Sequence, residues 1–154
     1  MKRKIISIFT LLLAVVFSAC FLLSCDKKEG NEGVSVQAHV VERDETLLVI
    51  QVDKTEGEAT LYDVMYYLKE EGDITFTSQS TQYGESIVSI NRVKGGVMDN
   101  PCWLAYTSDT DEANASLAWG GYEYQGQMLG SCNFGMSSMP VKAGCLYIWA
   151  LVQF

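Results

Sequence analysis

The chain has 154 residues, of which 48% are hydrophobic, and it carries 11 Lys and Arg against 19 Asp and Glu, a formal net charge of −8. A protein that binds duplex nucleic acid needs clustered Lys and Arg to face the phosphates, so this acidic balance argues against that class. The length suits one domain with a core that needs neither metal nor disulfides for stability.

The first 24 residues have the layout of a secretory signal peptide. Three basic residues at positions 2–4 precede an almost unbroken apolar run over residues 5–23. Removal of residues 1–24 takes away these three positive charges and brings the net charge to −11. No second apolar run approaches the 18 or so residues that span a bilayer. We therefore expect an exported, acidic, single-domain protein.

The apolar run ends in Leu22-Leu23-Ser24-Cys25, which resembles the lipobox of bacterial lipoproteins. The resemblance implies that Cys25 is diacylated and anchors the protein to the bacterial cell membrane on its extracytoplasmic side. Two acyl chains give a stable anchor, since each buried methylene contributes roughly 0.8 kcal/mol and one chain binds only marginally. Cys20 competes with Cys25 for this role but lacks a leucine three positions upstream. The other interpretation is an uncleaved transmembrane anchor.

After the lipobox, residues 25–33 are expected to form a flexible linker. Residues 26–33 are polar, include two glycines and have no apolar side chain to bury. The folded domain is therefore expected over residues 34–154.

The domain is expected to open with a hairpin. Residues 34–41 alternate between apolar and polar side chains, residues 42–45 make a charged turn, and residues 46–52 are rich in β-branched side chains. A second turn is expected over residues 53–58.

The clearest predicted element is a helix over residues 60–71. Its apolar residues Leu61, Val64, Met65 and Leu68 recur at helical spacing and form one stripe. Thr60 and Asp63 fit a capping box at the start, and Gly72 provides the stop.

The remaining elements are predicted to be strands. They are expected at residues 74–78, 87–93, 102–107 and 145–154, with loops at 95–101 and 108–116 and short strands and turns in the glycine-rich segment 119–139. The last strand is apolar and aromatic except for Gln153, which is typical of a strand at a sheet centre, buried on both faces. One helix among six or seven strands predicts an α+β domain, with the helix packed on a mostly antiparallel sheet.

Four fragments in order resemble the C-terminal domain of the transcobalamin and intrinsic-factor family, a module that also occurs as a domain of unassigned function in bacterial surface proteins. They are the helix start 60–65, the segment Tyr83-Gly84-Glu85-Ser86-Ile87-Val88-Ser89-Ile90, the Trp-centred strand 102–106, and the turn and aromatic strand 140–147. The resemblance is strongest over residues 59–154.

The resemblance implies the family's fold and a corrinoid as ligand. The sequence departs from the family in two respects. The vertebrate carriers clamp cobalamin between this domain and a large helical barrel, and no barrel is present here. The acidic residue usual after the late glycine is replaced by Cys145.

Aromatic residues beside glycines are the candidates for ligand binding, because aromatic faces stack on flat molecules and glycine permits close backbone approach. Trp103 and Tyr106 are three apart in a strand and should face opposite sides, whereas Tyr122 and Tyr124 should share a side. The alternative for all of these is ordinary core and edge packing. The candidate ligand-binding residues are Tyr83, Gly84, Trp103, Tyr106, Trp119, Gly121 and Tyr122.

Other chemistry is less well supported by the sequence. Two of Cys102, Cys132 and Cys145 are expected to pair in a disulfide in an oxidising compartment, with three free buried thiols as the alternative.

Residues 107–114 are rich in oxygen donors but do not fit the EF-hand template, so a solvated loop is expected there. His39, the only histidine, is expected on an exposed strand position, and no Gly-x-Ser-x-Gly elbow is present. We therefore expect no catalytic constellation, no metal site and no resident cofactor.

The anchor, the resemblance and the aromatic–glycine segments together predict a surface lipoprotein that binds a small ligand. The expected ligand is cobalamin or another corrinoid, delivered to a membrane transporter. The alternative is an adhesion or assembly module that contacts protein or glycan at the cell surface.

Overall fold

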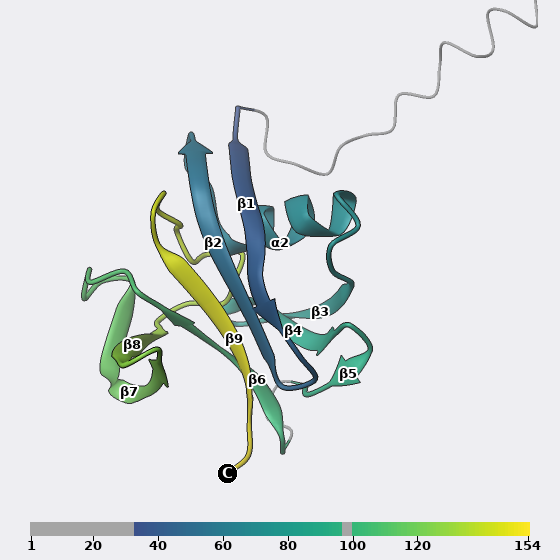
Figure 1. Ribbon diagram of the computed structural model, residues 1–154, viewed down its shortest axis with the longest axis vertical. Coiled ribbons are helices and arrows are strands. Elements are labelled where there is room, and N and C mark those ends of the chain that lie inside the picture. The colour runs from purple at the N-terminus through teal and green to yellow at the C-terminus, as the bar shows by residue number, and fades with distance from the viewer. Residues whose placement is uncertain (1–32, 97–99) are drawn as a thin grey trace, which may run out of the picture. The chain divides into compact units, whose positions relative to one another are not determined.

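The computed structural model describes residues 33–96 and 100–154 (Figure 1). Within these residues the chain forms nine strands and one helix, and every strand pair is antiparallel. The elements are β1 (Ser35–Arg43), β2 (Leu47–Glu56), α2 (Leu61–Glu70), β3 (Phe76–Thr81), β4 (Gly84–Ile90), β5 (Val93–Lys94), β6 (Cys102–Thr107), β7 (Ala115–Tyr124), β8 (Gln127–Cys132) and β9 (Leu146–Val152).

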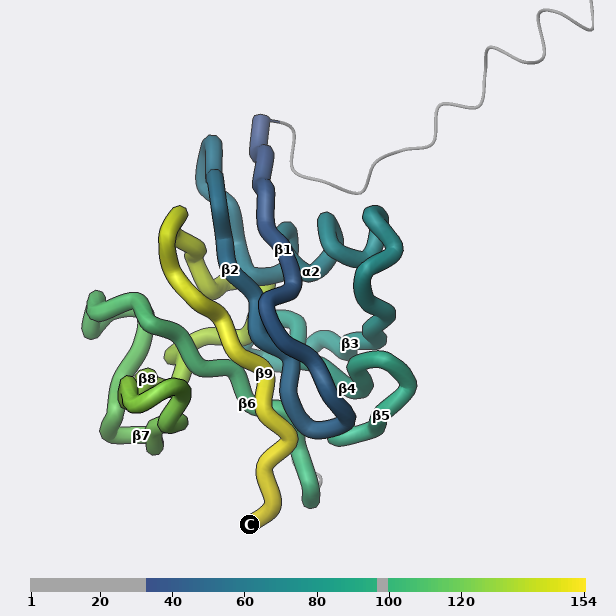
Figure 2. Tube along the Cα trace, viewed as in Figure 1, coloured from purple at the N-terminus to yellow at the C-terminus, as the bar shows by residue number. Residues whose placement is uncertain are grey.

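The strands form two sheets. Six of them make a sheet in the order β1-β2-β9-β6-β8-β7, and the other three make a small sheet in the order β3-β4-β5. Figure 2 shows the trace of β9 passing between β2 and β6. The domain is thus mostly antiparallel β-sheet with one short helix, in agreement with the predicted α+β class but richer in strand than expected.

β9 is the central strand of the larger sheet, as its apolar sequence predicted. Its residues 147–150 are all buried, and they alternate between two separate hydrophobic clusters, one on each face of the sheet. Tyr147 and Trp149 belong to the first cluster, whereas Ile148 and Ala150 belong to the second. This alternation follows from the two-residue period of a strand.

The first cluster lies between the six-stranded sheet and α2. The predicted apolar stripe Leu61, Val64, Met65 and Leu68 is fully buried here, against residues of β2 and β9. The predicted capping box is also present at Thr60. The Thr60 amide donates to Asp63 Oδ2 at 2.8 Å, and the Asp63 amide donates to Thr60 Oγ1 at 3.4 Å. The helix prediction is confirmed.

The second cluster lies on the opposite face of the sheet, where a side-chain hydrogen bond links the two edge strands. Tyr124 in β7 donates its hydroxyl proton to Glu42 Oε2 in β1 at 3.0 Å, although these strands are at opposite ends of the strand order. Burial and this carboxylate raise the pKa of Tyr124. Leu129 of β8 is buried in this cluster with Val49 and Ile148.

Several predicted boundaries differ from those of the structure. The strand at 102–107 agrees with β6, but β3 begins at Phe76 and β4 begins at Gly84, two and three residues away from the expected starts. The glycine-rich segment 119–139 is largely the β7–β8 hairpin rather than several short pieces. β1 and β2 extend past the expected hairpin ends, because cross-strand pairing continues through polar residues.

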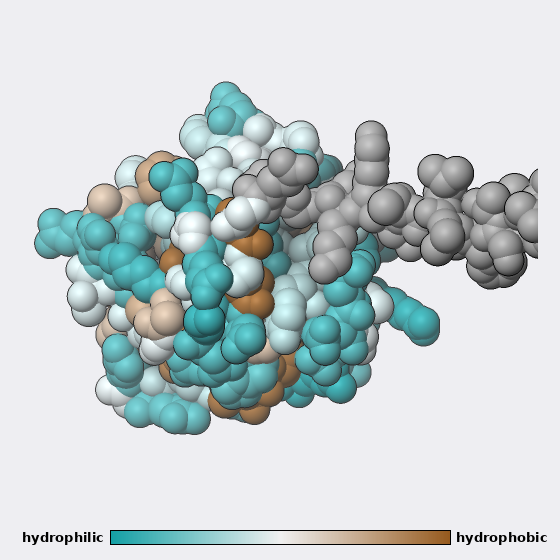
Figure 3. All heavy atoms as spheres, turned by 90° about the horizontal axis from the view of Figure 1, so that it is seen from above, coloured by the Kyte–Doolittle hydropathy of each residue, from teal (hydrophilic) through white to brown (hydrophobic). Residues whose placement is uncertain are grey.

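The predicted signal peptide 1–24, the lipid-attachment candidate Cys25, its competitor Cys20 and the linker up to residue 32 lie outside the described residues. Within the part that the structure describes, no helix has the length and apolar character needed to cross a bilayer. Figure 3 shows one face of the molecule, where hydrophilic residues dominate and hydrophobic ones emerge in patches between them.

Candidate functional site

The leading candidate site is an open cavity of about 530 Å³ between β4, β6 and the segment after β8. Small-molecule sites typically measure about 300–1,000 Å³ and are lined mainly by apolar and aromatic side chains. This cavity fits that description. Its lining comprises Tyr83, Glu85, Ser86, Ile87, Cys102, Trp103, Leu104, Ala105, Ser131, Cys132, Asn133, Phe134, Gly135, Met136, Trp149 and Phe154.

Five aromatic residues divide between the cavity's interior and its mouth. Trp103 and Trp149 are 6% and 4% exposed, so they form part of the buried wall. Tyr83, Phe134 and Phe154 are among the exposed large hydrophobic residues and lie nearer the solvent. Large exposed apolar side chains around a concave site are an informative exception to the burial rule.

Trp103 is fixed by contacts behind the cavity. Its Nε1 donates to the Val93 carbonyl at 3.1 Å, and its backbone amide donates to the Gly95 carbonyl at 2.9 Å. A Cβ at position 95 would lie 2.9 Å from Trp103 Cδ1, so only glycine lets the indole pack this closely. The cavity therefore has a preformed aromatic wall.

One side of the cavity is formed at a junction where the β3–β4 turn packs closely against the segment after β8. The Gly135 amide donates to the Tyr83 carbonyl at 3.0 Å, and the Met136 amide donates to the Glu85 carbonyl at 2.8 Å. A Cβ at position 135 would stand 2.5 Å from the Tyr83 carbonyl oxygen. Gly84, with a φ of +102°, lies against Ser137 at the same junction. The two backbones meet only because both positions are glycine.

Two buried polar atoms belong to residues of the cavity lining and lack a hydrogen-bond partner within the described residues: Asn133 Oδ1 and Trp149 Nε1. Asn133 uses its Nδ2 to donate to the Glu112 and Ala113 carbonyls at 3.0 and 3.1 Å. Most buried polar groups in proteins are hydrogen-bonded, so unpaired ones are rare and can mark a functional site. One acceptor and one donor are thus unsatisfied beside an apolar cavity.

The structure brings together only some of the predicted ligand-binding residues. Tyr83 and Trp103 line the cavity, and Gly84 adjoins it through Tyr83. Tyr106 and Tyr122 pack on each other in the second core cluster, with ring centroids 5.3 Å apart. As predicted, Trp103 and Tyr106 face opposite sides of the sheet.

Trp119 and Gly121 lie elsewhere, on β7. Trp119 is 79% exposed. Sequence reasoning missed Phe134, Trp149 and Phe154 as lining residues, because only the strand order shows which aromatic residues meet.

Cys102, Cys132 and Cys145 are thiols in the structure, so the predicted disulfide is not formed there. Cys102 pairs with Val152 at the end of β9, whereas Cys145 lies just before the start of β9. At the usual rise per residue, the seven residues from Cys145 to Val152 span about 23 Å, so Cys102 and Cys145 are far apart. A disulfide needs Cα atoms within about 7 Å. Burial, aided by the Asp109 charge, raises the pKa of Cys132 to about 12, so near neutral pH this thiol is protonated and a poor nucleophile.

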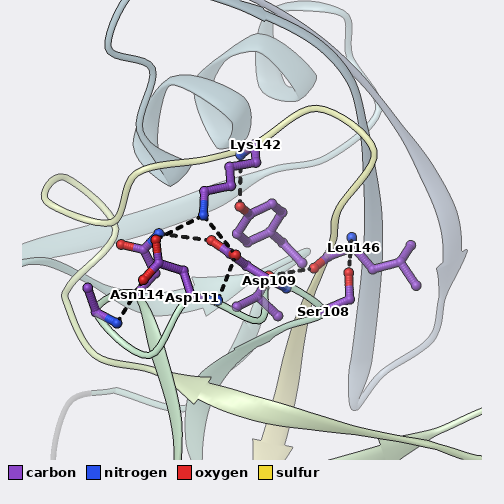
Figure 4. Close-up of polar contacts among 9 residues, drawn as sticks. Ser108, Asp109, Asp111, Asn114, Lys142 and Leu146 are labelled. Atoms are coloured by element: carbon purple, nitrogen blue, oxygen red, sulfur yellow. Dashed lines mark hydrogen bonds and ion pairs between the residues drawn. The ribbon is translucent and has the colours of Figure 1, made fainter.

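The oxygen-rich loop after β6 exposes residues 110–113 to solvent, as expected, but it is also held by an internal ion-pair network (Figure 4). Lys142 Nζ donates to Asp109 Oδ1 at 3.0 Å and to Asp111 Oδ2 at 3.1 Å. Asn114 Nδ2 donates to Asp109 Oδ2 at 2.8 Å, and the Asp111 amide donates to Asp109 Oδ1 at 3.0 Å. The expectation of a solvated loop was wrong for Asp109 and Asn114, which are both buried.

Asp109 stays ionised in spite of its burial. Burial alone would raise the pKa of its carboxyl, but the hydrogen bonds from Asn114, Lys142 and the Asp111 amide outweigh it and lower the pKa. The Lys142 ammonium thus compensates the negative charges of Asp109 and Asp111. Over residues 33–96 and 100–154, no group of three or more His, Cys, Asp or Glu is arranged to hold a metal ion.

His39 lies on an exposed position of β1, as expected, and its Nδ1 lies 2.8 Å from Asp53 Oδ2. His39 lies on the edge strand of the sheet and is not one of the residues that line the cavity.

Comparison of the chain with models of known families, with curated proteins and with solved structures found no match.

Proposed function

We propose that this protein is a binding module that takes a small, largely apolar ligand with a flat face into the cavity between β4 and β6. The observation that carries the proposal is the open cavity of about 530 Å³, whose lining combines two buried indoles with three exposed aromatic rings. Burial of apolar ligand surface supplies the affinity, at roughly 25 cal/mol per Å² removed from water.

The polar groups of the lining would orient such a ligand. Ser86 and Ser131 offer hydroxyl groups, and Asn133 and Trp149 each hold an unsatisfied polar atom. A ligand can form a hydrogen bond with either hydroxyl group, whereas the two unsatisfied atoms are buried and become accessible only if neighbouring side chains shift. Such a bond adds about 0.5–1.5 kcal/mol and selects one orientation.

As a separate and more specific assignment we propose cobalamin or a related corrinoid, a larger and more polar molecule of which only part would enter the cavity. Support comes from the resemblance of residues 59–154 to the transcobalamin C-terminal domain and from the flat shape of the corrin ring, which suits aromatic walls. Tyr83 and Trp103, both in the fragments that carry the resemblance, line the cavity. The chain would be held at the membrane by a diacylated Cys25 and would deliver its ligand to a transporter.

The test is a calorimetric titration of the purified protein with cobalamin, with cobinamide and with indole, a small aromatic probe of the cavity. Saturable corrinoid binding that disappears when Ala105→Leu narrows the cavity supports the full proposal. Indole binding without binding of either corrinoid supports a small-molecule site in this cavity and refutes the corrinoid assignment. If none of the three binds, the cavity is not a ligand site.

A further inference from the structure

A second cavity, of about 550 Å³, lies on a different part of the domain, between the loop after β6 and the β7–β8 hairpin. Its wall is more polar than that of the first cavity. The residues that line it are Thr107, Ser108, Asp109, Thr110, Glu112, Ala115, Ser116, Leu117, Ala118, Gln127, Met128 and Gly130. It shares no residue with the cavity between β4 and β6.

The loop that forms one wall is held rigidly by the network around Asp109 shown in Figure 4. Asn133 adds two hydrogen bonds to the carbonyls of Glu112 and Ala113. Within the described part of the chain, the side chains of Thr110, Glu112 and Gln127 make no hydrogen bonds of their own. The fixed loop thus presents the Thr110 hydroxyl and the Glu112 carboxylate to a ligand, and the Gln127 amide faces the same cavity from the start of β8.

The opposite wall is a break in the β7–β8 pairing. The register shifts between Ser116 and Gly121, so residues 117–120 bulge out of the ladder. Bulges of this kind re-aim side chains and recur beside functional sites. Trp119, directly after the cavity residue Ala118, is the most exposed large hydrophobic residue of those described, at 79%.

Two more apolar side chains extend this wall. Leu117 and Met128, both exposed, line the cavity. A Cβ at Gly121 would lie 2.9 Å from Leu117 Cδ2 and 2.7 Å from Met128 Sδ, so both side chains pack over that glycine. The second cavity therefore joins an apolar edge, formed by Leu117 and Met128, to free hydrogen-bonding groups, and the exposed Trp119 is the chain neighbour of its lining residue Ala118.

We infer that this second cavity binds a carbohydrate built of neutral pyranose units. A pyranose has hydroxyl groups around its rim that need both donors and acceptors, and apolar C–H faces that can stack on an indole. Thr110, Glu112 and Gln127 match the first requirement, and Trp119 with Leu117 matches the second. The acidic chain, with Glu112 in the wall, disfavours sugars that carry carboxylates or sulfates.

The experiment titrates the purified full chain with chitohexaose, maltohexaose and cellohexaose, and with an oligogalacturonate of the same length as the acidic comparison. At least one neutral hexasaccharide is expected to bind saturably, and Trp119→Ala and Gln127→Ala are each expected to weaken that binding at least tenfold. Tyr83→Ala is the matched control, because Tyr83 is an exposed aromatic residue on the other cavity.

Several results would overturn the inference. They are saturation by none of the three neutral sugars up to millimolar concentration, preferential binding of the oligogalacturonate, and sugar binding that Trp119→Ala leaves unchanged. Trp119-dependent binding to vesicles of phosphatidylcholine and phosphatidylglycerol, without sugar binding, would assign the bulge to a lipid surface instead. Ala105→Leu should leave sugar binding intact, so failure here and failure of the small-molecule proposal remain distinguishable.

Discussion

Replacement of Ala105 by leucine tests whether the cavity between β4 and β6 is open, and not filled by side chains, in the folded protein. Ala105 is half-buried in β6, pairs with Trp149 of β9, and lines the cavity. Leucine adds three carbon atoms that would enter the cavity. Each fully buried methylene contributes about 0.8 kcal/mol, and partial burial reduces the gain for all three to about 1 kcal/mol.

The sign of the stability change decides between an open and a filled site. In a cavity of about 530 Å³ the larger side chain fits, and the free energy of unfolding should rise by about 1 kcal/mol. In a closely packed site, extra methylenes force strain and cost about 1–3 kcal/mol.

Urea unfolding followed by far-UV circular dichroism measures this difference. With a slope near 2 kcal/mol per M, the midpoint should move up by roughly 0.5 M. Ala143→Leu, the same change at an exposed position outside both cavities, should stay within about 0.5 kcal/mol of the parent. A fall of 1 kcal/mol or more in the Ala105→Leu protein would refute the reasoning.

Three further predictions concern the cavity junction, the loop network and the anchor. Gly135→Ala should cost about 1–3 kcal/mol in a urea melt and weaken ligand binding, because the new Cβ displaces the Tyr83 carbonyl; unchanged stability would contradict the close contact. Asp109→Asn should cost about 2 kcal/mol at pH 7 by removing a buried, hydrogen-bonded acceptor. The pKa of Asp109 is lowered in the folded protein, so its ionised carboxylate contributes fully to stability above about pH 4, and this contribution is lost as the pH falls through the folded-state pKa. The stability difference between the parent and the Asp109→Asn protein should therefore be smaller at pH 3 than at pH 7. An equal difference at both pH values argues against an ionised Asp109. Cys25→Ser should abolish metabolic labelling with radioactive palmitate and release the protein from membranes, whereas Cys20→Ser should leave both unchanged; the reverse pattern would move the anchor to Cys20.

The sequence was most informative where local periodicity and burial coincide. The helix Leu61–Glu70 has its apolar stripe and capping box within one short segment, so both could be predicted without knowledge of the fold. The same holds for β9, whose unbroken apolar run indicated burial on both faces. In these elements the residues that decide the structure are neighbours in the chain.

The candidate site was less predictable because its walls come from distant segments. Trp103 and Trp149 belong to strands that pair only in the folded sheet, and Phe154 joins them from the last position of the chain. Tyr106 and Tyr122 were placed on strands, but their contact follows from the order β6-β8-β7 in the folded sheet, which has no local signal. The β7 bulge likewise depends on a register shift that no sequence period reveals.

The most direct test of the central claim is the calorimetric titration of the purified protein with cobalamin and cobinamide, in parallel with the Ala105→Leu protein. Saturable corrinoid binding by the parent chain, lost in a variant that is equally or more stable, is the predicted result and would place the ligand in the cavity between β4 and β6. A flat titration of the parent chain with both corrinoids would contradict the assignment.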